Sequence, residues 1–137
     1  MPPTQNAHED HFDAIIVGAG FAGMYMLYKL RGMGLSARVY ERGDGVGGTW
    51  YWNRYPGARC DFESMEYSYS FDDALQQDWD WKEKYGTQPE ILKYASHVAD
   101  RLDLGRVGIR PIPRRLCTLA AREQTIIEEA WIRSRPD

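Results

Sequence analysis

The stretch that decides the fold is Phe12–Gly23, which reads FDAIIVGAGFAG. Its first six residues form a short apolar run, which is typical of a strand in a buried parallel sheet. The run leads directly into the glycines at positions 18, 20 and 23, and a helical pattern of apolar residues follows until Gly32. This order of strand, glycine turn and helix predicts the first half of a βαβ unit.

A second strand over Ala37–Tyr40, closing at Glu41, would complete that unit within about thirty residues. In the GxGxxG pattern, Gly18 permits the tight turn, Gly20 lets a diphosphate approach the backbone, and Gly23 lets helix and strand pack closely. The phosphates would lie at the helix N-terminus, where free N–H groups and the helix dipole favour anions. Glu41 would accept hydrogen bonds from ribose hydroxyls. The alternative is a glycine-rich turn that binds no ligand.

A second glycine-rich segment, Gly45–Trp50, follows the acidic end of the second predicted strand. It is placed to lie against the same dinucleotide, and FAD enzymes use such a segment more often than NAD enzymes do. The segment therefore favours FAD, and a plain surface loop is the alternative.

Beyond Trp50 the chain is rich in aromatic residues and less regular. Alternating serines and aromatic residues over Tyr67–Phe71 indicate a short strand. Thr87 as the cap, Pro89 in the first turn and Glu90 closing a capping box predict the start of a helix with one apolar face. Further on, prolines at 111 and 113 would break a strand, and residues 116–132 have the pattern of a helix.

Composition excludes several classes of function. The 137 residues suffice for about one domain, and a net charge of −3 without a basic stripe argues against nucleic acid. No apolar run approaches the roughly 18 residues of a membrane helix. Cys60 and Cys117 are far apart and have no disulfide-like or metal-like spacing, so a reducing cytoplasm is the default expectation. No metal site or protein partner is indicated.

The run Gly47–Asp61 (GGTWYWNRYPGARCD) resembles the corresponding segment of Baeyer–Villiger monooxygenases, the group of phenylacetone, cyclohexanone and steroid monooxygenases. Tyr67–Phe71 and Thr87–Leu92 are similar to later segments of that family. The resemblance covers Phe12 to about Leu104. It implies an α/β fold, a Rossmann-like FAD-binding domain with a parallel sheet, which is incomplete here and carries a helical C-terminal part.

The resemblance also implies which residues contact FAD. One group would hold the pyrophosphate and the adenosine ribose, and a second group would line the flavin. The first group is Gly18, Gly20, Phe21, Gly23 and Glu41, and the second is Gly48, Thr49, Trp50 and Tyr67.

Three consecutive residues are implied near NADP and the flavin ring. Arg59 and Cys60 lie where the family approaches NADP. Asp61 would lie beside the flavin and orient an active-site arginine that belongs to a later part of the family's chain. Without the resemblance, Asp61 reads as a solvated loop acid, Cys60 as an inert small residue, and Tyr67 as a core side chain.

The activity implied is insertion of one oxygen atom from O₂ into a small-molecule ketone, giving an ester or lactone, with NADPH reducing the bound FAD. A flavin monooxygenase that oxygenates nitrogen or sulfur, and a non-catalytic module that binds FAD or ADP, are the alternatives. The sequence holds no second GxGxxG, so the NADPH-binding domain is missing and we expect the isolated chain to be inactive.

The expected organisation has three parts. Residues 1–11 read as a disordered leader, residues 12–104 as a partial FAD-binding domain, and residues 105–137 as a divergent tail. The change of character near Gly105 suggests a frameshift or truncation, so that the tail would not be homologous sequence.

Overall fold

The computed structural model describes residues 12–107 and 109–111. The expected leader and the helix predicted over 116–132 lie outside these residues. In chain order the elements are β1 (Ala14–Val17), α1 (Phe21–Gly32), β2 (Ala37–Glu41), α2 (Thr49–Trp52), α3 (Asp73–Gln77), α4 (Gln88–Arg101), α5 (Leu104–Val107) and β3 (Ile109–Pro111).

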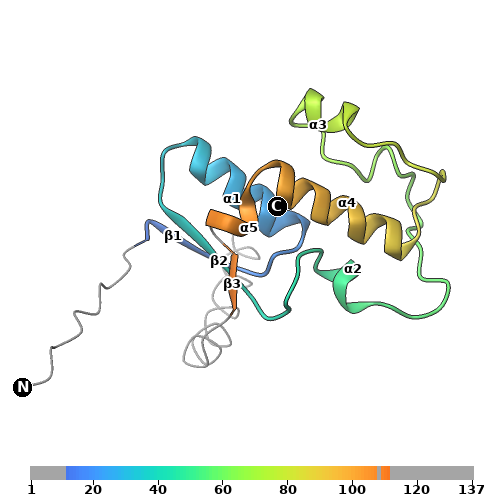
Figure 1. Cartoon of the computed structure of the whole chain (residues 1–137), viewed down its shortest axis with the longest axis horizontal. Coiled ribbons are helices and arrows are strands. Elements are labelled where there is room, and N and C mark those ends of the chain that lie inside the picture. The colour runs from blue at the N-terminus through green and yellow to red at the C-terminus, as the bar shows by residue number, and fades with distance from the viewer. Residues whose placement is uncertain (1–11, 108, 112–137) are drawn as a thin grey trace, which may run out of the picture.

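The strands form one parallel sheet in the order β1-β2-β3. Ala14 pairs with Ala37, and Val39 pairs with Ile109. Figure 1 shows α1 beside β1 and β2, as the connection between two parallel strands requires. The predicted βαβ unit is therefore confirmed, with the strand and helix bounds close to those expected.

One face of β1 is covered and the other is not. Ile16 packs against the core cluster that contains Met24 and Leu27 of α1. Ile15 and Val17 point to the opposite face and remain 52% and 56% exposed. The expectation of a strand in a buried parallel sheet is therefore met on one face only, and the other face of β1 is apolar and exposed.

Pro111, the first of the two prolines expected to break a strand, is the residue at which a strand ends, and Pro113 lies outside the described residues. Ile109–Pro111 forms β3 and pairs with β2 along its whole length. Pro111 is the last residue of this strand, and β3 is at the edge of the described sheet. A proline that needs no ladder hydrogen bond is tolerated at such a position.

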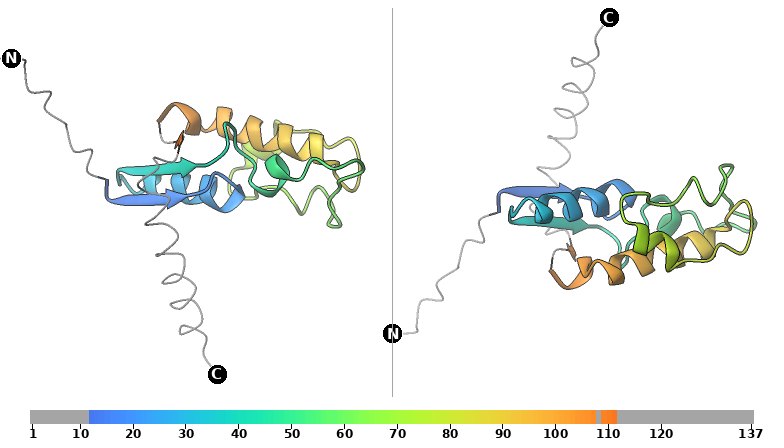
Figure 2. Two further views of the ribbon diagram at one scale, coloured as in Figure 1. Left: turned by 90° about the horizontal axis from the view of Figure 1, so that it is seen from below. Right: turned by 90° about the horizontal axis from the view of Figure 1, so that it is seen from above.

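The rest of the fold is organised by α4, which has six buried residues on its inner face. Ala95 and Ala99 join Met24, Leu27 and Val39 in the core beside the sheet. Further along the chain, the loops between α2 and α4 wrap around the other half of this helix. Figure 2 shows the sheet and α1 at one end of the elongated molecule and these loops at the other.

Two local expectations in this region are wrong. Tyr67–Phe71 forms turns and bends instead of a strand, because its backbone and side chains bond to neighbouring helices rather than to another strand. The helix does begin at Gln88 behind Thr87, but Thr87 makes no side-chain cap bond. Glu90 accepts instead from the backbone N–H of Lys82 at 2.8 Å, so the capping box is not formed.

We predict that Gly23→Ala severely destabilises the chain. A Cβ at this position would lie 2.0 Å from the carbonyl oxygen of Gly18, which is backbone and cannot move aside. We expect a loss of about 3 kcal/mol or more in the free energy of unfolding, measured by urea denaturation followed by circular dichroism. Gly32→Ala, at the end of the same helix with nothing within 4 Å, is the matched control. Equal stability of the two variants would contradict the expected contact.

Candidate functional site

The turn from β1 into α1 has the geometry that the glycine pattern predicts. Gly18 has a φ of +95°, a conformation that side chains disfavour, and its N–H donates to the Tyr40 carbonyl at 2.8 Å. Gly20 is the N-cap of α1, supplies no side-chain cap, and is followed by no acidic residue in the first turn. The first N–H groups of the helix are therefore left to an external acceptor, which suits an anion.

Glu41 ends β2 beside this turn. Its side chain is buried, with 6% of the residue exposed. One carboxylate oxygen accepts from the Ala19 N–H at 2.6 Å, and the other accepts from the Gly43 N–H at 2.8 Å. An ionised carboxylate offers about four acceptor positions, so these two bonds leave capacity for hydroxyl groups of a ligand. The acid thus points toward the glycine turn, as a ribose-binding acid requires.

The loop Gly43–Gly48 packs directly on the glycine turn. The Gly47 N–H donates to the Ala19 carbonyl at 3.0 Å. At Gly48 the backbone has a φ of +55°, and a Cβ there would lie 2.9 Å from the Cα of Gly20. The two glycine-rich segments of the sequence therefore lie against each other. A side chain at Gly48 would fill the space between the backbones of these two segments.

The residues expected near the flavin form an aromatic cluster next to this site. Trp50 is 8% exposed, and its indole N–H donates to the hydroxyl oxygen of Tyr67 at 2.9 Å. The Trp50 and Tyr67 rings meet edge to face with their centroids 5.8 Å apart, and the centroid of the Phe21 ring lies 5.4 Å from that of Tyr67. Thr49 is exposed at the start of α2. The structure thus brings Phe21, Trp50 and Tyr67 together, beside the end of α1 that carries the glycines.

The three residues implied near NADP and the flavin ring have different surroundings. The guanidinium of Arg59 bonds to the Glu83 carboxylate at 2.6 Å and to the Tyr85 carbonyl at 2.9 Å. Cys60 is buried against Trp50, and its sulfur accepts a hydrogen bond from Phe62. Asp61 is exposed. Contact of any of the three with NADP stays a prediction.

Two residues that support the site were missed by the sequence analysis. Gln88 is buried, with 7% exposed; its side-chain amide donates to the Trp50 carbonyl and its backbone N–H donates to Ala58. The hydroxyl of Tyr69 donates to the carbonyl of Phe21 in the first turn of α1. A glutamine inside a helix-start motif carries no signal of burial, so only the three-dimensional contacts reveal its role.

Burial also changes the acidity of two tyrosines in this cluster. Desolvation raises the pKa of Tyr69 well above its ordinary value, and the neighbouring Tyr94 adds to the effect. Desolvation likewise raises the pKa of Tyr94, whose hydroxyl oxygen accepts from the Tyr69 backbone N–H at 2.8 Å. Both hydroxyls therefore remain neutral hydrogen-bonding groups throughout the physiological range.

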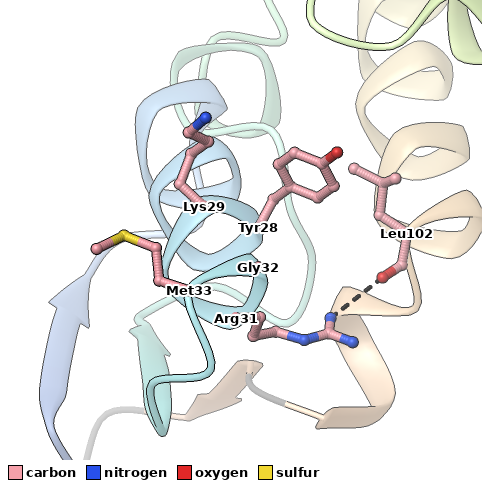
Figure 3. A pocket seen from close by; sticks show the side chains of 6 residues that line it. All are labelled: Tyr28, Lys29, Arg31, Gly32, Met33 and Leu102. Carbon is pink, nitrogen blue, oxygen red and sulfur yellow. Dashed lines mark hydrogen bonds between the residues drawn. The ribbon is translucent and has the colours of Figure 1, made fainter.

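A surface pocket of about 480 Å³ lies at the opposite end of α1. Figure 3 shows Tyr28, Lys29 and Met33 around it and Arg31 directed toward α4, where its guanidinium donates to the Leu102 carbonyl at 3.1 Å. A basic side chain at the C-terminal end of a helix satisfies free carbonyls there. This pocket is thus a junction between two helix ends, and none of the predicted site residues lines it.

Comparison with known proteins identifies this arrangement. Residues 16–80 match the family model of an NAD(P)-binding Rossmann-like domain. A Baeyer–Villiger monooxygenase of Pseudooceanicola batsensis is 56% identical over 69% of this chain. The structure of a steroid monooxygenase bound to NADP matches 72% of the chain at 61% identity, with a TM-score of 0.70. The chain is homologous to the N-terminal region of Baeyer–Villiger monooxygenases.

The match has a limited extent and includes a further chemistry. This chain spans 18% of the Pseudooceanicola relative and 19% of the steroid monooxygenase, so about a fifth of each. A phenazine N-monooxygenase of Lysobacter antibioticus is also 56% identical, over 70% of the chain. Among the described residues, no helix is long and apolar enough to cross a membrane, and no group of three potential metal ligands occurs.

We predict that Tyr67→Phe destabilises the aromatic cluster. The buried Trp50 N–H would lose its acceptor, which costs about 1–2 kcal/mol in the free energy of unfolding. Urea denaturation followed by tryptophan fluorescence measures the loss. Tyr55→Phe removes a hydroxyl from a tyrosine that is 63% exposed and should leave stability unchanged. A loss no larger than that of the control would show that the Trp50–Tyr67 bond contributes nothing.

We also predict that stability falls in alkaline solution through Tyr69. A raised pKa in the folded state gives stability that is complete below the unfolded pKa, near the ordinary value of 10.0, and declines as the pH rises above it. Tyr69→Phe should lower stability at pH 7 but make the decline above pH 10.0 less steep, as measured by urea midpoints across that range. An unchanged slope would refute the assignment to Tyr69.

Proposed function

We propose that residues 12–111 hold the ADP half of FAD in a Baeyer–Villiger monooxygenase, an NADPH-dependent enzyme that inserts oxygen into ketones. The proposal is carried by one observation, the buried Glu41 carboxylate directed at the turn between β1 and α1. An acid at the end of β2 and an uncapped helix N-terminus at the end of β1 together match the ribose and the diphosphate of a dinucleotide.

The residues present fit the cofactor. Gly18 and Gly20 leave the backbone open to the diphosphate, while Glu41 has acceptor positions for the ribose hydroxyls. Phe21, Trp50 and Tyr67 form an apolar surface next to these groups and would face the flavin half. A carboxylate at the ribose favours a free 2′-hydroxyl over a 2′-phosphate, because like charges repel, and this favours FAD over NADP at this site.

In the whole enzyme, the cofactor would supply the chemistry and the protein would position the cofactor. FAD, reduced by NADPH, supplies the activation of O₂. The protein residues bind and orient the cofactor and exclude water. Asp61, exposed on its loop, would orient an arginine from a part of the enzyme beyond this sequence, and Arg59 would hold that loop through Glu83. We therefore expect no ketone turnover by the 137-residue chain itself.

A second candidate function is oxygenation of a ring nitrogen. It is favoured by the similarity to the phenazine N-monooxygenase, which is as close in identity as the Baeyer–Villiger relative. Both reactions need the same FAD site, so the described residues support them equally. The choice depends on the substrate pocket, and assaying a ketone and a phenazine with the enzyme that carries the rest of the family's length would separate them.

We predict that the purified chain binds ADP and FAD with similar weak affinity, and that Glu41→Gln weakens both by about tenfold. The amide keeps the shape but loses the charge and part of the acceptor capacity for ribose hydroxyls. Titration calorimetry measures both ligands, with FMN, which lacks the AMP part of FAD and therefore the adenosine ribose, as a ligand that should not respond to the substitution. Equal affinity of Glu41→Gln and the wild-type chain for ADP would contradict the assigned ribose site.

A matched control is Glu66→Gln, which removes a carboxylate from the exposed residue that directly precedes Tyr67 in the sequence. It changes the net charge of the chain by the same amount as Glu41→Gln. We expect it to leave ADP affinity unchanged, since its charge is solvated. A wild-type chain that binds neither ADP nor FAD would overturn the proposed function.

A further inference from the structure

We propose that Tyr51 is a positioning residue of the dinucleotide site, one that holds the loop after β2 so that the Glu41 carboxylate faces the glycine turn. The inference rests on the proposed function, because it concerns the same site. It assigns a role to an aromatic side chain that the glycine pattern does not include. The case is built from the contacts of the Tyr51 ring, of its hydroxyl and of its backbone.

The ring of Tyr51 lies over two of the loop glycines. A Cβ on Gly43 would lie 2.7 Å from ring carbon Cε1, and one on Gly45 would lie 3.2 Å from Cε2. Neither glycine has a left-handed backbone conformation. Their lack of a side chain is therefore explained by the ring above them and not by a turn.

The hydroxyl of Tyr51 also binds to the same loop, at Asp44. It donates a hydrogen bond to the Asp44 carboxylate, and the Asp44 backbone N–H lies 3.4 Å from the same oxygen. The Arg54 guanidinium also lies over the ring, 4.6 Å from its centre, and its Nε donates to the Tyr51 carbonyl at 2.7 Å. The Tyr51 ring is thus held by the loop glycines, by Arg54 and through its hydroxyl, and these contacts limit its movement.

What the ring fixes is the segment that bonds to Glu41. Gly43 donates its N–H to Glu41, whose other oxygen accepts from Ala19 in the glycine turn. The contact of the Tyr51 ring with Gly43 therefore acts on the carboxylate through a single hydrogen bond. A loop free to move would let the carboxylate leave the turn, at a cost in ribose binding.

The test uses the whole chain and begins without any ligand. We expect Tyr51→Leu to raise the amide hydrogen exchange rates of Gly43 and Ala19 about tenfold, measured by NMR, while Gly18, which bonds to Tyr40 in the β-sheet, stays protected. Tyr55→Leu, on an exposed tyrosine four residues away, is the matched control. Tyr51→Phe keeps the ring over Gly43 and should retain most of the protection.

A double-mutant cycle shows whether the ring acts through Gly43. Gly43→Ala should displace the ring and raise the same two exchange rates. Adding Tyr51→Leu to Gly43→Ala should then have little further effect, because Gly43→Ala has already displaced the ring from the loop, so that the two substitutions are not additive. Additive effects, or a Tyr51→Leu variant that exchanges like Tyr55→Leu, would overturn the inference.

Binding then connects the loop to the ligand. Tyr51→Leu should weaken ADP binding about five- to tenfold and leave the affinity for FMN unchanged. ADP affinity equal to that of the wild-type chain, despite faster exchange at Gly43, would also overturn the inference. A wild-type chain that binds no ADP would refute the proposed function instead, and the exchange experiment would still decide whether Tyr51 holds the carboxylate.

Discussion

The close approach of α1 to the turn after β1 is the constraint on which the rest of the structure depends. At Gly23 the helix lies so near the Gly18 carbonyl that no side chain fits between them. This contact fixes the direction in which the helix leaves the sheet. It thereby sets where the helix N-terminus points and which face of β1 is covered. The other glycines of the site can leave room for a ligand only after this packing has placed the helix N-terminus beside the turn.

Much of this could be predicted from sequence because the determining residues are local. The strand, the glycine turn, α1 and β2 all fall within Ala14–Glu41, and the periodic pattern and glycine spacing report directly on backbone sterics. The position of Glu41 follows from the same unit, since the ends of adjacent parallel strands meet at one edge. One of its two backbone donors, Ala19, belongs to the same glycine turn, whereas the other, Gly43, lies in a loop whose path no pattern specifies.

The aromatic segment was harder to predict for a physical reason. Tyr67–Phe71 alternates as a strand does, yet within the described part of the chain it pairs with no strand, and Tyr69 bonds instead to α1 and α4. Rings of this size bury large areas and satisfy their polar ends with whichever partner is near, so tertiary contacts decide the backbone. The same explanation applies to Gln88 and Tyr51, whose roles come from residues distant in sequence or from the shape of a loop.

The ADP half and the flavin half of the proposed site differ in how much of the chain builds them. The ADP half is built by β1, α1, β2 and the loop to Gly48, all within the first part of the chain and tied together by backbone hydrogen bonds. The proposed flavin half has an aromatic surface, and of the three residues predicted near NADP, Cys60 is buried while Arg59 and Asp61 are exposed. Binding of the nucleotide is therefore separable in principle from redox chemistry. Such a division would predict what the comparisons give, a Baeyer–Villiger monooxygenase and a phenazine N-monooxygenase that are each 56% identical to this chain.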